Sequence, residues 1–316
     1  MIEILLKNIS SPAILFFFTG IFSGLVKSDL KIPEQVSKFI GLYLMMAIGY
    51  KGGYAISQQV ITLKMIYLTI ATIAIAFLQP FLCFFFLQAT TLDKKTKAAI
   101  SSHYSSISMA TFLTAISFLK LKSIPYQGYI IAIASIMDAP AIISGLYLST
   151  EKHEIKIKPL LRKIFSNGSM LLLLFSIIIG FIGSQSGMNQ MKGLLDTPFT
   201  GFLAFFLLDK GITVALQREE FKNFDIRVFL FGILMPIFGA IIGIVTSKVI
   251  GLDFGTAFLF TVLTSSASYI VVTSILKDLL PDAKIEIYLT LSLGVTFPFN
   301  ITLGMPLYFW ALKLIL

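Results

Sequence analysis

The sequence predicts an all-α integral membrane protein of about ten transmembrane helices, arranged as two inverted five-helix repeats with broken fourth and ninth helices. Three observations predict this fold: an apolar composition, a series of apolar runs with alternating flanking charge, and an internal repeat. Of the 316 residues, 56% are hydrophobic and only 13% are charged, whereas a soluble domain carries about 25% charged residues. Such a chain has enough apolar side chains to face lipid as well as to fill a core.

The apolar runs are long enough to cross a bilayer, which takes about 20 helical residues. The first run has no small-residue cleavage site, so we expect a spanning helix there and not a signal peptide. No stretch has the composition of a soluble domain or a low-complexity linker. The predicted spans lie near residues 11–27, 34–57, 62–88, 95–119, 126–148, 166–184, 197–216, 226–250, 254–279 and 285–315.

The basic residues between these runs predict the topology. If both termini lie outside the cytoplasm, the inside loops hold 16 of the 25 lysines and arginines and the outside segments hold seven. Cytoplasmic loops of membrane proteins carry such an excess. Topology therefore explains the net charge of +9 without a nucleic-acid partner. We expect a multi-pass protein of the bacterial inner membrane, with a basic connector at 150–165 in the cytoplasm.

This connector separates two repeats, 1–149 and 166–316, whose motifs recur in the same order. Because each repeat has an odd number of spans, the two halves must have opposite orientations. Inverted repeats with broken helices in corresponding positions are typical of secondary transporters, which bind their substrate near the midplane. The matching pairs, offset by about 158–163 residues, are IGYKGGYAI (48–56) with LLDKGITVA (207–215), SSHYSSIS (101–108) with TSSASYIV (264–271), and MDAPA (137–141) with VTFPF (295–299).

The fourth span of each repeat is unusual because hydroxyl residues gather in it. If each of these spans is two half-helices, the amides at a half-helix N-terminus attract an anion. Carbonyls and hydroxyls at the break can ligate a small hard cation. We predict breaks around 104–109 and 267–272; the alternative is that small hydroxyl residues merely allow close helix packing. The clusters are Ser101, Ser102, Ser105, Ser106, Ser108 and Thr111, and Thr264, Ser265, Ser266, Ser268 and Thr273.

Few charged residues lie inside the predicted spans. Asp138 precedes Pro140, which removes a backbone donor and leaves a carbonyl free, so the carboxylate suits sodium; alternatively it faces water at a helix end. Asp209 and Lys210 could pair with each other or with Lys51, and intramembrane charges are functional hypotheses by default. The two lysines could instead extend to the interface.

The motifs of other protein classes are absent from the sequence. The lone Cys83 excludes an internal disulfide and a cysteine metal cluster. There is no phosphate-binding loop, no metal-spaced His/Cys set and no nucleophile motif. His103, in the broken region, is expected to be a packing or hydrogen-bonding residue. The sequence therefore favours a transporter over a membrane enzyme or an ATP-driven pump, with no cofactor other than a coupling ion.

Several segments resemble one known family in order along nearly the whole chain. The segments IPEQVSKFIGLYLMMAIGYKGGYAI (32–56), IPYQGYIIAIASIMDAPAIISGLYL (124–148) and FLLDKGITVALQREEFKNF (206–224) resemble the sodium-dependent bicarbonate permeases of the SbtA type. TSSASYI (264–270) and VTFPFNITLGMPLYFWAL (295–312) fall where that family has its ninth and tenth spans. The resemblance implies a ten-helix inverted-repeat permease with core and gate domains, commonly trimeric. It also implies sodium-coupled uptake of bicarbonate bound between the broken spans.

The resemblance also implies site residues. The family's Ser-Gly-Ser-Thr segment falls on Ser108 to Thr111, and its Ser-Ser-Ser-Asp segment falls on Ser266 to Tyr269. From these segments and the serine clusters we expect anion binding by Ser105, Ser106, Ser108, Thr111, Ser266, Ala267, Ser268 and Tyr269. We expect sodium binding by Ser102, Asp138, Ser265 and Thr296.

This sequence departs from the family pattern at these same segments. Met109 stands in place of a glycine, and Tyr269 stands in place of a carboxylate. The central loop is short, which weighs against regulation by a PII-like partner protein. The alternatives to bicarbonate symport are a proton- or sodium-coupled transporter of a small carboxylate and a non-transporting receptor on the same scaffold.

Overall fold

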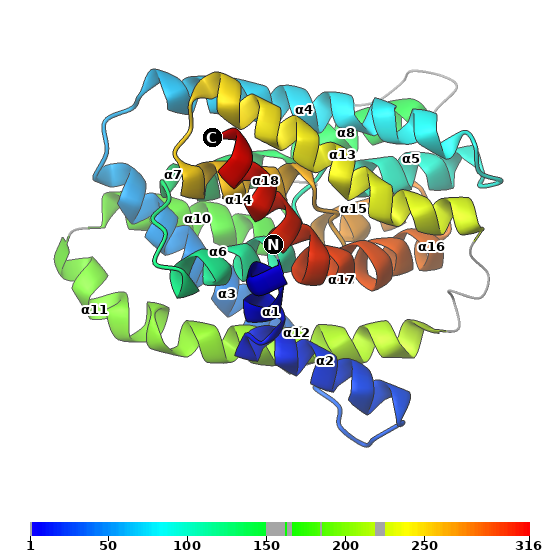
Figure 1. Cartoon of the computed structure of the whole chain (residues 1–316), viewed down its shortest axis with the longest axis horizontal. Helices are drawn as coiled ribbons and strands as arrows, with labels where there is room; N and C mark the ends of the chain where they lie inside the picture. Colours follow the sequence, from blue (N-terminus) through cyan, green and yellow to red (C-terminus); the bar gives the residue numbers. More distant parts are fainter. Residues whose placement is uncertain (1, 150–161, 163–165, 184, 219–224) are drawn as a thin grey trace.

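The protein is a bundle of long helices, most of which run side by side (Figure 1). The computed structural model describes the chain except for residues 1, 150–161, 163–165, 184 and 219–224. The described residues contain no β-strand. All of the predicted connector 150–165 except residue 162 lies outside the described residues. The prediction of an all-α membrane protein is confirmed.

The helices of the first half follow the predicted spans closely. Asp93 caps α5 by accepting a hydrogen bond from the Thr96 amide, with 2.9 Å between Oδ1 and N. An N-cap of this kind satisfies one of the free amides of the first turn. The helices are α1 (Ile2–Ile9), α2 (Pro12–Leu25), α3 (Glu34–Ser57), α4 (Leu63–Leu87), α5 (Lys94–His103), α6 (Met109–Leu121), α7 (Tyr129–Ile136) and α8 (Asp138–Ser149).

The second half has the same kinds of helix. Asp253 caps α14 through the Thr256 amide at 3.0 Å, as Asp93 caps α5. The tenth predicted span contains two π-helical segments, 291–296 and 300–304, on either side of Pro298. The helices are α10 (Gly168–Ile182), α11 (Gln185–Leu195), α12 (Thr197–Leu216), α13 (Ile226–Ile250), α14 (Phe254–Thr264), α15 (Val271–Leu279), α16 (Ile285–Thr290), α17 (Phe297–Phe299) and α18 (Met305–Ile315).

Six helical stretches within the described residues are long and apolar enough to cross a membrane. The number is seven if α1 and α2, bent by 66° at their junction, form one span. The helices α6, α10 and α14 are apolar but shorter than 18 residues. For α6 and α14 the reason is that the predicted spans to which they belong are interrupted. α5 ends at His103 and α6 begins at Met109, while α14 ends at Thr264 and α15 begins at Val271.

Two helix pairs pack with very close backbones. α2 lies against α12 and α3 lies against α10. At the first contact, a Cβ added at Gly211 would lie 2.1 Å from the carbonyl oxygen of Phe17. At the second, a Cβ added at Gly53 would lie 1.9 Å from the carbonyl oxygen of Ile177. Small residues allow such approaches between helices in membranes. These glycines therefore permit the close packing of α2 on α12 and of α3 on α10.

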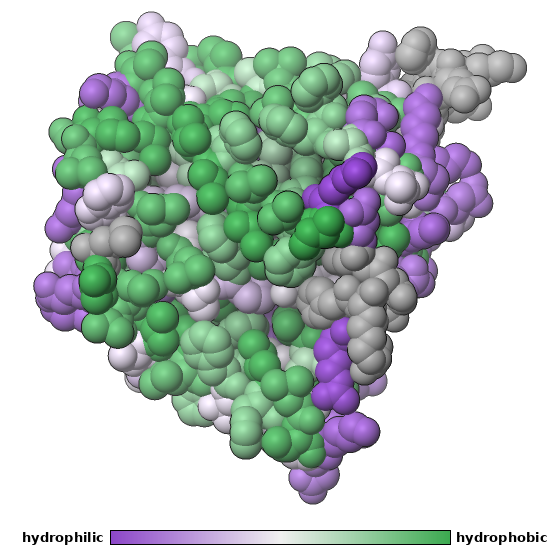
Figure 2. Space-filling model, turned by 45° about the vertical axis from the view of Figure 1, so that its right-hand side comes forward, coloured by the Kyte–Doolittle hydropathy of each residue, from purple (hydrophilic) through white to green (hydrophobic). Residues whose placement is uncertain are grey.

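The outer surface is strongly apolar. Figure 2 shows hydrophobic residues across the middle of one face, with hydrophilic residues gathered toward its left and right margins. Long apolar side chains such as Phe85, Ile182 and Val249 are more than half exposed. Exposed apolar surface of this extent marks contact with lipid. The chain is therefore a multi-pass membrane protein.

Candidate functional site

The two interrupted helices touch at their breaks. The amide of Ser268 donates to the carbonyl of His103 at 2.8 Å, which joins the second break to the end of α5. The amide of Ser108 donates to the hydroxyl oxygen of Ser266 at 3.0 Å. Irregular backbone at membrane depth is tolerated where it is buried in protein, and the residues at this contact are buried. The crossing of the two breaks is therefore the polar centre of the molecule.

Two amide side chains hold the ends of the half-helices in place. Gln79 Nε2, on α4, donates to the carbonyl oxygens of Tyr104 at 2.6 Å and of Thr264 at 3.0 Å. Asn300 Nδ2 donates to the carbonyl oxygen of Ser265 at 2.8 Å, and its own Oδ1 accepts the Tyr308 hydroxyl. The last carbonyls of a helix lack partners within it, so these donors satisfy groups that the breaks expose.

Sequence analysis did not single out Gln79 or Asn300. The available signal was an amide side chain inside an otherwise apolar run, next to Pro80 and after Phe299 respectively. An isolated polar group within a span needs a partner, because the hydrocarbon offers none.

The N-terminus of α6 is capped within the crossing. The Ser108 side chain accepts from the Thr111 amide at 3.4 Å and from the Thr111 hydroxyl at 2.8 Å. The first amides of α6 carry the partial positive charge of a helix N-terminus. α15 likewise begins at Val271, directly after the second break. Two helix N-termini thus lie at the crossing, and a helix N-terminus favours negative charge.

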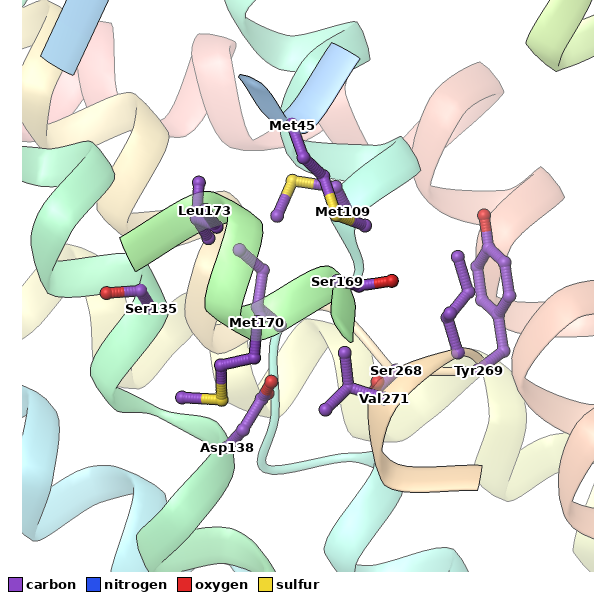
Figure 3. A pocket seen from close by; sticks show the side chains of 12 residues that line it. Met45, Met109, Ser135, Asp138, Ser169, Met170, Leu173, Ser268, Tyr269 and Val271 are labelled. Carbon is purple, nitrogen blue, oxygen red and sulfur yellow. The ribbon is translucent and has the colours of Figure 1, made fainter. Parts of the chain in front are cut away.

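A small pocket lies beside the crossing, and Figure 3 shows its lining. Asp138 directs its carboxylate into the pocket next to Met170, while Ser268 and Tyr269 line the opposite side. The space open to the centre of a water molecule is about 20 Å³, which suffices for about one or two waters. Met45, Met109 and Met170 also line it. Methionine side chains are flexible and fill irregular gaps.

Asp138 stands at the first residue of α8, directly after the end of α7 and a bend at Met137. Its side chain is buried, with 3% relative exposure. The Ser106 hydroxyl, in the first break, donates to its carboxylate. The carboxylate therefore lies within reach of the crossing and faces a pocket, which is the placement expected for a cation ligand.

The other three residues predicted to bind sodium are each engaged elsewhere. Ser102 Oγ donates to the Ala98 carbonyl at 3.3 Å, and a Cβ added at Gly145 of α8 would collide with it. Ser265 Oγ donates to the Val262 carbonyl at 3.2 Å. Thr296 Oγ1 donates to the Gly232 carbonyl at 2.7 Å and pairs with the Tyr104 hydroxyl. No hydrogen bond among the described residues links any of these side chains to Asp138.

The residues predicted to bind the anion are more closely grouped. Ser106, Ser108, Thr111, Ser266 and Ser268 belong to the hydrogen bonds of the crossing described above. Ala267 is buried within the second break.

Ser105 and Tyr269 stand apart from this group. The Ser105 hydroxyl donates to the Ser101 carbonyl, four residues back in the chain. Tyr269 packs edge-on against Phe297, with 6.0 Å between the ring centroids. Its buried hydroxyl lies near Ser108 but has no hydrogen-bond partner of ordinary geometry among the described residues.

His103 is a hydrogen-bonding residue, as expected. Its Nδ1 lies 2.6 Å from the Ala99 carbonyl, and its Nε2 lies 3.0 Å from the Thr273 hydroxyl, so the ring links α5 to α15. It also stacks on Tyr288. Within the described part of the chain, no group of three or more His, Cys, Asp or Glu residues could hold a metal ion.

A larger cavity of about 800 Å³ adjoins the pocket and shares Met45, Ser169 and Ile270 with it. Its wall includes Lys210, which pairs with Asp209 at 2.7 Å. The same Asp209 oxygen accepts the Ser37 hydroxyl at 2.6 Å. This cavity connects the crossing with the side of the molecule where α3 and α10 begin.

Lys51 lines a separate cavity of about 440 Å³, bordered by Tyr126 and Phe199. It pairs with Asp196 at 2.5 Å. Of the pairings left open by the sequence, Lys210 is therefore joined to its neighbour Asp209, and Lys51 is joined to neither of them.

A sequence model of the Na⁺-dependent bicarbonate transporter superfamily matches residues 12–313, nearly the whole chain. No curated protein matches the sequence.

Proposed function

The chain belongs to the Na⁺-dependent bicarbonate transporter superfamily, and from this premise we propose that it is a sodium-coupled symporter of bicarbonate or a similar small monovalent anion. A member of this superfamily is a transporter and not an enzyme. The observation that carries the proposal is the crossing of two helix breaks beside the buried carboxylate of Asp138.

The anion would bind at the N-termini of α6 and α15. A small anion would be held there by backbone amides and by the hydroxyls of Ser108 and Ser268. This arrangement suits a weakly held, rapidly released substrate. Met109 and Tyr269 border the pocket, so their size limits the anion that enters.

Sodium would bind near Asp138. A carboxylate supplies the charge, and oxygen atoms at the break supply the remaining ligands that a hard cation prefers. Ser106 already points its hydroxyl at this carboxylate and would rotate to offer its oxygen instead. The hydroxyls of Ser102, Ser265 and Thr296 would join the site only by leaving their present backbone partners.

The inverted repeat is the architecture that we propose for this transporter, with five spans in 1–149, a connector at 150–165 and five spans in 166–316. Several contacts support it because they recur between the halves. Asp93 and Asp253 are equivalent caps. Thr96 accepts from the Lys284 amide at 3.0 Å, and Thr256 accepts from the Gln127 amide at 2.8 Å. In both contacts the start of one half's fourth span is joined to the start of the other half's fifth span.

We further propose the inner membrane as the location and both termini outside the cytoplasm, on the basis of the distribution of basic residues. The family resemblance implies a homotrimeric assembly. The short connector makes a PII-like partner a weaker expectation.

Uptake of labelled bicarbonate into proteoliposomes, with and without an inward sodium gradient, tests the function. Gradient-dependent accumulation is expected. Accumulation driven equally well by a proton gradient without sodium, or competition by a small carboxylate at lower concentration than bicarbonate, would replace the proposal with the carboxylate transporter. Binding without any accumulation would favour a receptor.

A further inference from the structure

Three lysines from distant parts of the sequence meet in one pocket. Lys7 is in the last turn of α1, Lys122 caps the C-terminus of α6, and Lys313 is in the last turn of α18. All three line a pocket of about 380 Å³ together with Glu3 and Phe309. They are three of the seven basic residues that the topology places outside the cytoplasm. The positive-inside distribution therefore does not account for their gathering.

The ammonium groups are close to one another. The Nζ atoms of Lys122 and Lys313 lie 5.4 and 5.2 Å from the centroid of the same Phe309 ring. They are thus no more than about 11 Å apart, which is close to the Debye length at physiological ionic strength. Burial, and the charges of Lys7 and Lys313, lower the pKa of Lys122 from its usual value.

The positive charge of this pocket is only partly balanced by the protein. Glu3 is the one carboxylate among the described lining residues, and it pairs with Lys7 at 2.7 Å. Neither Lys122 nor Lys313 forms an ion pair within the described part of the chain. A bound anion would offset the mutual repulsion of these lysines.

A simpler explanation is that each lysine interacts favourably with the negative end of its own helix. That effect favours each lysine separately and gives no reason for the three helix ends to converge. Lys192 and Lys248 lie in the last turns of α11 and α13, and neither lines this pocket. They provide a direct comparison between an isolated helix-end lysine and a clustered one.

The surroundings indicate the chemical nature of the anion. Ile2, Leu6 and Leu314, on the two helices that flank the pocket, are more than half exposed. A second pocket, the groove beside Phe118, has a volume of about 400 Å³ and shares Lys7 and Lys122. Its other lining residues are Ala13, Phe118 and Leu121 together with Asn8, Ser11, Thr114 and Ser117. A basic pocket bordered by exposed apolar side chains fits a phosphate that carries acyl chains better than a free phosphate ion.

We propose that Lys7, Lys122 and Lys313 bind the phosphate of an anionic phospholipid, with part of an acyl chain in the groove beside Phe118. Polybasic sites at membrane surfaces recognise anionic head groups in this way. The bound lipid would fix α1 and α18 against the end of α6.

Trp310, the only tryptophan, lies one turn before Lys313 on α18 and is 38% exposed, so it reports lipid at this place. The full chain is placed in nanodiscs of phosphatidylcholine with increasing amounts of acyl-brominated phosphatidylglycerol or acyl-brominated phosphatidylcholine. We expect half-maximal quenching of Trp310 at a lower mole fraction of the brominated anionic lipid. The double variant Lys122→Gln/Lys313→Gln should need roughly 30-fold more anionic lipid, since each lysine contributes about a fivefold preference.

The matched control is Lys192→Gln/Lys248→Gln, which removes the same charge from two other helix ends and should quench like the unchanged protein. Equal quenching by both lipids, or an equal loss of preference in the two double variants, would overturn the proposal. Titration with inorganic phosphate in detergent separates the two sources of phosphate. A saturable change in Trp310 fluorescence there, without preference for the anionic lipid in nanodiscs, would assign the pocket to free phosphate instead.

Discussion

Replacing Asp138 by asparagine tests the candidate cation site with little disturbance of the fold. Asparagine has nearly the same shape, and its carbonyl oxygen can still accept the Ser106 hydroxyl that now bonds to the carboxylate. The side chain is buried with 3% relative exposure, so water cannot replace the missing charge. The substitution therefore removes a charge from the pocket and leaves its packing intact.

The expected magnitude follows from this burial. The attraction between a carboxylate and a monovalent cation 4 Å apart is about 4 kcal/mol at an effective dielectric constant of 20. The amide dipole of asparagine recovers part of this attraction. We therefore expect sodium binding to weaken by about 1.4 to 3 kcal/mol, which is a rise of about 10- to 150-fold in the sodium concentration for half-maximal uptake.

The assay is uptake of labelled bicarbonate into proteoliposomes over a range of external sodium concentrations. Expression and thermal unfolding in detergent should match the unchanged protein. Asp282→Asn is the control, because that carboxylate is exposed and pairs with Lys95 away from the pocket. Unchanged sodium dependence in Asp138→Asn, with normal uptake, would remove this residue from the cation site and leave it as a hydrogen-bond acceptor of Ser106.

Three further predictions concern packing and the crossing. Gly211→Ala should lower the free energy of unfolding by about 1–3 kcal/mol, because the new methyl group would lie 2.1 Å from the Phe17 carbonyl oxygen. The control Gly201→Ala, which has open space on the same helix, should leave the free energy of unfolding unchanged. Equal thermal stability of the two variants would contradict the close packing of α2 and α12. Gln79→Leu should cost about 1–3 kcal/mol for each carbonyl left without its donor, whereas Gln88→Leu at the exposed end of the same helix should be neutral in the same unfolding assay. Tyr269→Phe should change neither stability nor uptake, since the hydroxyl has no hydrogen-bond partner of ordinary geometry. Tyr269→Asp should strengthen sodium dependence if uptake survives. If neither substitution affects sodium affinity, the ring is a packing residue.

Much of the helical arrangement could be predicted because apolar length and loop charge are local properties. The predicted spans 34–57 and 226–250 coincide with α3 and α13. The breaks, predicted around 104–109 and 267–272, lie at 104–108 and 265–270. The π-helical segments at 291–296 and 300–304 were not predicted, because an apolar run has no feature that separates a π-helical from an α-helical turn.

The side chains that hold the broken helix ends together, Gln79 and Asn300, could not be predicted from one sequence. Gln79 reaches a carbonyl 185 residues away and Asn300 reaches one 35 residues away. Which carbonyls need donors depends on where each half-helix ends, and that is set by the packing of both halves. Similarly, Asn8 donates to the Ile301 carbonyl at 2.7 Å, within the π-helical segment that the sequence did not reveal.

Existing hydrogen bonds and close packing limit which side-chain oxygen atoms remain for a cation. Among the predicted sodium ligands, Thr296 already donates to a carbonyl and pairs with a second hydroxyl, and Ser102 is enclosed against Gly145. Their hydroxyls serve the fold. The carboxylate of Asp138 and the backbone oxygen atoms of the two breaks are oriented by the contacts at the crossing. Gln79 and Asn300 hold the helix ends that carry those oxygen atoms. A substitution of either side chain should therefore alter cation affinity, although neither side chain is a proposed cation ligand. The serine clusters in the sequence thus predicted where the chain breaks, whereas the contacts that hold the broken ends together depend on the packing of both halves.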